Sequence, residues 1–110
     1  MKAREGLNME TIYKGTLYTV PVSSPTKIDG ARLYNLATQT YIVASLALIN
    51  YSDGAYHYSM DLTPADTASI PQGIYNLELF SNDDNNNPFI EAYYDNYAKV
   101  KESSFTKEYT

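Results

Sequence analysis

Two stretches of strict alternation constrain the fold more than any other feature of the chain. In residues 55–62 every second side chain is apolar or aromatic, and the positions are Tyr56, Tyr58, Met60 and Leu62. The intervening residues His57, Ser59 and Asp61 are polar. Residues 75–79 repeat the pattern, with Tyr75, Leu77 and Leu79 as the apolar positions. A period of two places alternate side chains on opposite faces of a β-strand, so both stretches are predicted to be half-buried strands.

The residues between these two strands carry the signals of a short helix. Thr63 is a good N-cap, Pro64 suits the first helical position, and Asp66 places a carboxylate in the first turn. Pro71 ends the helix, and Gly73 supplies the permissive backbone with which the next strand begins. We therefore predict a strand, a helical crossover and a second strand, and the crossover can carry the chain from one sheet of a sandwich to the other.

Further strands are predicted for residues 11–22, 31–37, 40–49 and 89–100. Pro21 cannot donate to a strand ladder, so the first of these should lie at an edge or end there. Residues 40–49, "TYIVASLALI", are apolar on both faces. This favours a central strand, with a helix as the alternative. Asp53-Gly54 is typical of a hairpin turn, and residues 81–88, "SNDDNNNP", are expected to form an exposed loop.

Short strands with a turn roughly every ten residues predict an all-β fold, a single antiparallel immunoglobulin-like β-sandwich with one short helical crossover. The domain should span residues 11–100, with an N-terminal arm at 1–10 and a C-terminal tail at 101–110. Gly73 should adopt a conformation that other residues resist and so direct Tyr75 into the core. The expected core consists of Leu17, Leu46, Leu48, Tyr58, Met60, Tyr75, Leu77 and Leu79.

Charge and composition argue against several classes of function. The net charge of −5 disfavours a nucleic-acid partner, which normally requires a basic face. No apolar run approaches the ~18 residues of a membrane span, and the N-terminus lacks the apolar segment of a signal peptide. The absence of cysteine excludes disulfides, thiolate zinc sites and thiol nucleophiles, and fits a protein made in a reducing cytoplasm.

No set of residues indicates catalysis. His57 is the only histidine and is expected on the outward phase of its strand. Ser52 and Asp53 have no partner that would complete a triad. Oxygen ligands for calcium could come from Asp83, Asp84, Asn85 and Asn87, but the glycine and glutamate of an EF-hand are missing, so a solvated turn is favoured. We predict a protein that is not an enzyme and has no cofactor or metal.

The segment "DLTPADTASIPQGIYNLELF" resembles a motif of small immunoglobulin-like sandwiches in tailed bacteriophages and prophages. The positions that carry the resemblance are Leu62, Thr63, Thr67, Ile70, Pro71, Gly73 and Tyr75, with Pro64 inside the same motif. An upstream "DGARL", residues 29–33, is similar to the family's early strand entry. The loop "SNDDNNNP" departs from the simpler hairpin of that family. The resemblance implies a structural baseplate, tail-fibre or head accessory component with no catalytic residues.

Two functions are therefore carried forward. The first is a virion structural protein, made in the bacterial host cytoplasm, whose polar arms contact other virion proteins and copies of itself. The alternative is a carbohydrate-binding module, for which Tyr93 and Tyr97 could form an exposed platform. The twelve Tyr, against three Phe and no Trp, fit either strand composition or an interaction surface.

Overall fold

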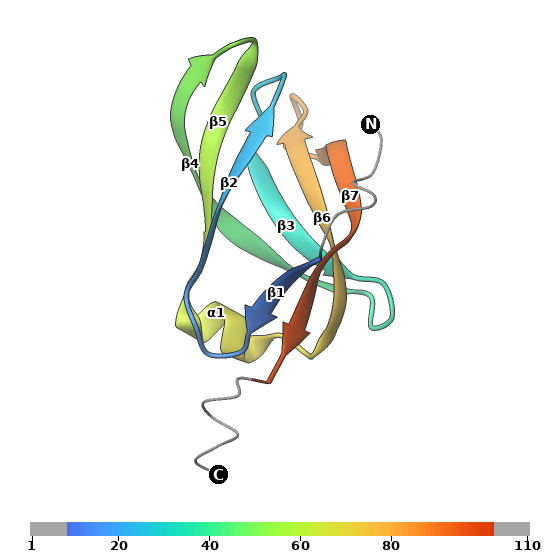
Figure 1. Ribbon diagram of the computed structural model, residues 1–110. Coiled ribbons are helices and arrows are strands. Elements are labelled where there is room, and N and C mark those ends of the chain that lie inside the picture. The colour runs from blue at the N-terminus through green and yellow to red at the C-terminus, as the bar shows by residue number, and fades with distance from the viewer. Residues whose placement is uncertain (1–8, 103–110) are drawn as a thin grey trace.

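The structure is a computed structural model that describes residues 9–102 of the chain. It contains seven strands and one helix (Figure 1). In chain order these are β1 (Glu10–Tyr13), β2 (Tyr18–Ser24), β3 (Gly30–Asn35), β4 (Thr40–Ser52), β5 (Ala55–Leu62), α1 (Pro64–Ser69), β6 (Gly73–Asn82) and β7 (Pro88–Lys101). Glu10 and Lys101, placed in the predicted arm and tail, thus belong to strands, and residues 1–8 and 103–110 lie outside the described residues.

The strands form one sheet in the order β1-β7-β6-β3-β4-β5-β2, which curls like a barrel (Figure 1). The predicted all-β class is confirmed. The sheet is not wholly antiparallel, because β1 runs parallel to β7. β4 joins two halves: Thr40–Ala44 pair with β3, and Ser45–Ser52 pair with β5. Residues 40–49 are therefore a strand with partners on both sides, as predicted, and not the alternative helix.

The strand predicted for residues 11–22 is wrong, because the structure divides it in two. Gly15 has a φ of +80°, which glycine adopts readily, and the Thr16 N–H donates to the Tyr13 carbonyl at 3.2 Å. This turn sends β1 and β2 to opposite ends of the sheet. β2 pairs with β5 alone among the described strands, so the edge position inferred from Pro21 is confirmed.

The predicted helical crossover is confirmed as α1, and it lies across one end of the curled sheet (Figure 1). The Thr63 hydroxyl accepts from the Asp66 N–H at 3.1 Å, and the Asp66 carboxylate accepts from the Thr63 N–H at 2.9 Å. This reciprocal capping box stabilises a helix too short to form alone. Lys14 closes the other end by donating from Nζ to the carbonyls of Ala68 and Ile70. The helix carries the chain from β5 in one half of the sheet to β6 in the other.

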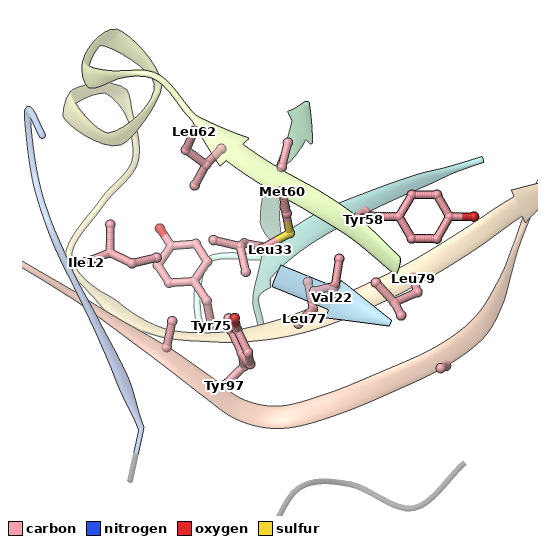
Figure 2. Packing of buried hydrophobic residues seen from close by; sticks show 14 of the residues in the cluster. Ile12, Val22, Leu33, Tyr58, Met60, Leu62, Tyr75, Leu77, Leu79 and Tyr97 are labelled. Atoms are coloured by element: carbon pink, nitrogen blue, oxygen red, sulfur yellow. The ribbon is translucent and has the colours of Figure 1, made fainter. Parts of the chain in front are cut away.

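The core lies inside the curl, where side chains from both halves meet (Figure 2). The expected core residues Tyr58, Met60, Tyr75, Leu77 and Leu79 are buried, and Leu46 is partly buried against them. Ile12, Leu33 and Leu62 complete the centre (Figure 2).

Two expected core residues are exposed instead. Leu17 is 64% exposed because it lies beside the turn that separates β1 from β2. Leu48 is 49% exposed, next to a register shift between Leu48 and Asn50. Beyond this shift the β4–β5 hairpin projects past the other strands (Figure 1). Its tip is the predicted Asp53-Gly54 turn, with positive φ at both residues.

The glycine prediction is confirmed. Gly73 has a φ of +141°, and a Cβ there would lie 3.2 Å from Nδ2 of Asn35. Two residues later Tyr75 is fully buried, and its hydroxyl donates to the Pro71 carbonyl at 2.6 Å. Burial raises the pKa of Tyr75, and a hydrogen bond with the Asn35 side chain partly offsets the rise. Pro71, Gly73 and Tyr75 thus form one connected entry into β6.

Candidate interaction surfaces

The first candidate surface is the outer face of β4, β3, β6 and β7. The strand register aligns Val43, Arg32, Glu78 and Tyr93 in one row across these strands. Residues in one row share a face, so their side chains are neighbours. The exposed apolar residues of this outer face include Leu36, Tyr41, Val43, Ile90 and Tyr93. Such a group of exposed apolar side chains is typical of a binding surface.

An ion pair organises the centre of the outer face. Arg32 Nε donates to Glu78 Oε1 at 2.6 Å, and both side chains are about three-quarters or more shielded from solvent. The guanidinium carbon lies 4.8 Å from the ring centre of Tyr41 and 5.8 Å from that of Phe80. Such stacking adds a cation–π attraction. Because the charges are paired, the surface presents aromatic rings without a net charge at its centre.

A groove of about 590 Å³ adjoins Tyr93 on the outer face. Its lining includes Leu36, Asn76, Glu78, Tyr93 and Asp95. An aromatic ring beside amide and carboxylate groups can contact a hydroxyl-rich ligand through both stacking and hydrogen bonds.

The predicted pairing of Tyr93 with Tyr97 on one exposed platform is wrong. Tyr93 is 42% exposed, whereas Tyr97 is 5% exposed and points toward the core near Tyr75 (Figure 2). The cause is a bulge in β7: Tyr75 pairs with Ala98 and Leu77 with Tyr94, so β7 has two extra residues there. Asn96 adopts a φ of +51°, and its N–H donates to Asn76 Oδ1 at 2.9 Å. The bulge interrupts the alternation of inward and outward side chains along β7, which would otherwise place Tyr97 on the same exposed face as Tyr93.

The second candidate surface is the opening between β2 and the β1–β7 edge, which we call the seam. No described strand pairs with the outer edge of β2, and β1 covers β7 only from Ala98 to Lys101. A cavity of about 370 Å³ lies in the seam. Its lining includes Glu10, Val20, Val22, Leu77, Tyr94 and Tyr97. The seam is therefore an apolar opening that reaches the core, bordered by one carboxylate.

Hydroxyl groups bridge the seam. The Tyr18 and Tyr97 hydroxyls are 2.9 Å apart, and the Tyr18 hydroxyl donates to Glu10 Oε1 at 3.3 Å. Burial raises the pKa of Tyr18 strongly, and the hydrogen bond with Tyr97 and the charge of Glu10 raise it further. No short segment of the sequence predicts this bridge, because its three residues lie on three different strands.

His57 lies on the outward phase of β5, as predicted. Its Nδ1 is 2.8 Å from Ser23 Oγ, and its Nε2 is 3.2 Å from the Ser52 carbonyl. A carbonyl can only accept a hydrogen bond, so Nε2 of His57 carries the proton and donates to it. Nδ1 is then the acceptor, and the Ser23 hydroxyl donates to it. A serine–histidine pair needs a carboxylate orienter and an oxyanion site for acyl transfer, and a carbonyl supplies neither. The contact joins neighbouring strands.

The candidate calcium ligands form a self-contained turn. Asp83 Oδ1 accepts from the N–H groups of Asn85 and Asn87 at 2.8 and 2.9 Å. The Asn86 N–H donates to the Asp83 carbonyl at 2.9 Å. One carboxylate oxygen of Asp83 thus closes the loop. Within residues 9–102, no group of three or more His, Cys, Asp or Glu is arranged to hold a metal ion.

The residues of the sequence motif lie on or beside α1. Leu62 is buried, Thr63 caps the helix, Pro64 begins it, and Pro71 accepts the Tyr75 hydroxyl. Thr67 is buried and donates to the Thr16 carbonyl at 2.7 Å, which ties the helix to the β1–β2 turn. The motif therefore has structural roles here.

The chain was compared with known proteins, and it matches no family model, no curated protein and no solved structure. None of the helices in the described part of the chain is long and apolar enough to span a membrane. The geometry defines an all-β domain with two candidate contact surfaces, the outer face and the seam.

Proposed function

We propose that the chain is a non-enzymatic structural component of a bacteriophage virion, in the tail, the baseplate or the capsid decoration. It would act by contact with other virion proteins and with copies of itself. The observation that carries this proposal is the outer face, where Tyr41, Val43, Ile90 and Tyr93 surround a charge-neutralised centre. Aromatic residues with few unpaired charges are what the centres of protein interfaces contain.

The motif supports the phage context of this proposal. The resemblance to phage sandwiches rests on residues 62–75, and these residues build the capped helix and the Gly73 entry. We further propose that the curled sheet is a variant of the immunoglobulin-like sandwich. The support is that β4 divides its pairing between two halves whose buried faces meet.

The experiment is to purify the phage particles of the lysogen or lysate that encodes the chain and identify their proteins by mass spectrometry. Electron microscopy with an antibody against the chain then locates it on the head, tail or baseplate. Stoichiometric recovery with particles is expected. Recovery only in the particle-free supernatant would contradict a virion role.

Variants of the outer face test the contact itself. Tyr93→Lys together with Val43→Lys should reduce incorporation into particles at least tenfold, because two charges would be desolvated at the interface, at ~1.4 kcal/mol per tenfold. The matched control is Leu17→Lys with Ala68→Lys, which adds the same charge at exposed sites away from the outer face. Equal incorporation of both double variants would mean that the outer face does not make the contact with the particle.

The groove beside Tyr93 favours a second candidate, a carbohydrate-binding module. Its support is the combination of one exposed tyrosine ring with the side chains of Asn76, Glu78 and Asp95. A glycan array with the purified protein tests it, with Tyr93→Ala as the matched variant. Specific binding that this variant abolishes would favour the module, and an array without signal would exclude it for the glycans displayed.

A further inference from the structure

The seam has the properties of a site for strand addition. β2 offers an edge without a described partner, and the cavity beside it is lined by Val20, Val22 and Leu77. An extended peptide can add to such an edge through backbone hydrogen bonds, and alternate side chains then fill the pockets. Pro21 has no N–H group, so β2 can offer one backbone hydrogen bond fewer to an added strand. The side chains that enter the cavity would therefore decide which peptide binds.

The chain's own N-terminal segment has the wrong pattern for this cavity. In β1, Ile12 is buried and Glu10 lies toward Tyr18, so even-numbered residues face inward. A strand continued backward in this register would direct Asn8, Gly6 and Arg4 into the apolar cavity. An amide, a glycine and a guanidinium do not complement Val20, Val22 and Leu77.

The C-terminal segment has the right pattern. Phe105, Lys107 and Tyr109 occur at alternate positions, so a strand would present them on one face. The two rings match the apolar lining, and Lys107 between them matches Glu10, a carboxylate at the cavity.

Phe105 cannot reach the level of Leu77 in the seam of its own chain. Lys101 lies one residue beyond Val100, which pairs with Gly73. Leu77 is four residues further along β6, so the distance along the sheet from Lys101 to Leu77 is five strand residues, about 17 Å. Four residues from Lys101 to Phe105 reach at most about 14 Å, and they would first have to reverse direction. The segment of another copy has no such restriction.

We propose that the seam receives residues 103–110 of a second copy of this chain, which adds as a strand beside β2. Phe105 and Tyr109 enter the cavity, and Lys107 pairs with Glu10. Because the seam and the tail are different surfaces, each contact is heterologous, and copies can link head to tail. This inference rests on the proposed function, for which it supplies the contact between copies.

The probe is a synthetic peptide of residues 103–110, titrated into protein that ends at Glu102. We expect saturable binding, with NMR shift changes concentrated at Val20, Val22 and Leu77. A peptide with Phe105→Asp should bind at least about tenfold more weakly, because it brings a carboxylate to an apolar cavity. Absence of binding, equal binding of the two peptides, or shifts confined to the outer face would overturn the proposal.

A charge exchange in the full chain gives a second readout. Glu10→Lys should weaken concentration-dependent self-association in analytical ultracentrifugation, and Glu10→Lys with Lys107→Glu should restore it. Leu17→Lys, an exposed change outside the seam, is the control and should have no effect. Deletion of residues 103–110 should abolish self-association, whereas deletion of residues 1–8 should preserve it. The reverse outcome for the two deletions, or no rescue by the exchange, would overturn the proposal.

The two proposals fail separately. A chain recovered in particles whose seam does not bind the peptide would retain its virion role and lose only the tail contact. A chain that binds the peptide but is absent from particles would lose the virion role.

Discussion

Tyr18 on β2 and Tyr97 on β7 place their hydroxyls 2.9 Å apart, across the one opening between described edge strands. The two residues are far apart in sequence and belong to strands that do not pair with each other. Their hydrogen bond, with the Glu10 carboxylate beside it, connects the two ends of the sheet. The barrel-like shape thus depends at this point on side chains instead of a strand ladder.

Removing one hydroxyl should weaken this connection. Tyr18→Phe should lower the free energy of unfolding by about 1 kcal/mol, the usual net worth of one such hydrogen bond. Urea denaturation followed by circular dichroism measures the change. Tyr51→Phe is the matched control, because Tyr51 is 59% exposed and should have almost no effect. Equal stabilities of the two variants would mean that the bridge contributes nothing.

Alkaline pH should destabilise the protein through the same tyrosine. The pKa of Tyr18 is raised in the folded state above its ordinary value of 10.0, so above pH 10 the unfolded chain loses the proton first. The unfolded state then binds fewer protons than the folded state, and stability falls as the pH rises. The free energy of unfolding, measured from pH 8 to 11.5, should fall less steeply in Tyr18→Phe than in the parent. If the free energy of unfolding fell equally steeply with pH in both proteins, Tyr18 would not be the group responsible.

Leu77 and Leu48 test the corrected core. Leu77 is 1% exposed, so Leu77→Ala should cost about 2–5 kcal/mol through lost burial and a residual cavity. Leu48 is 49% exposed, and Leu48→Ala should stay within about 0.5 kcal/mol. Chemical denaturation of both variants gives the comparison. A large loss in Leu48→Ala would place that residue back in the core.

Gly73 tests the entry into β6. Gly73→Val should destabilise by well over the ~0.5 kcal/mol of a surface change, because a φ of +141° disfavours a β-branched residue. The new side chain would also press on Asn35, whose Oδ1 accepts from the N–H groups of Ala37 and Thr38. Lys99→Val, at the exposed position paired with Ile74, is the control. A melting temperature as high as the control's would remove the reason given for this glycine.

The parts that the sequence predicts well are those with local causes. The helix from Pro64 to Ser69 follows from Thr63, Asp66 and Pro71 alone, because a cap and a stop act within a few residues. The buried faces of β5 and β6 follow from their unbroken period of two. The hairpin at Asp53-Gly54 follows from a turn that needs positive φ at both residues.

The parts that it predicts poorly depend on register across strands. Tyr97 lies inside because a bulge, with Asn96 in a left-handed conformation, inserts residues opposite β6. The only local sign of it was an asparagine, which tolerates that conformation. Gly15 is compatible with the turn between β1 and β2, but the β-branched and aromatic residues on both sides of it favour one continuous strand. The outer face and the seam arise from strand order, which no short segment specifies.

The parallel pairing of β1 with β7 determines how the domain would carry tension. Glu10, where the described chain enters β1, lies opposite Ala98, and Lys101, where it leaves β7, lies opposite Tyr13. Pulling the two ends apart therefore slides β1 along β7 and loads the hydrogen bonds of this pair together, in shear, instead of opening them one after another. Stretching single molecules by their ends should give one sharp rupture, where a peeling geometry would give a gradual extension. Domains of this kind pulled through their two ends would each resist stretching until the β1–β7 pair ruptures.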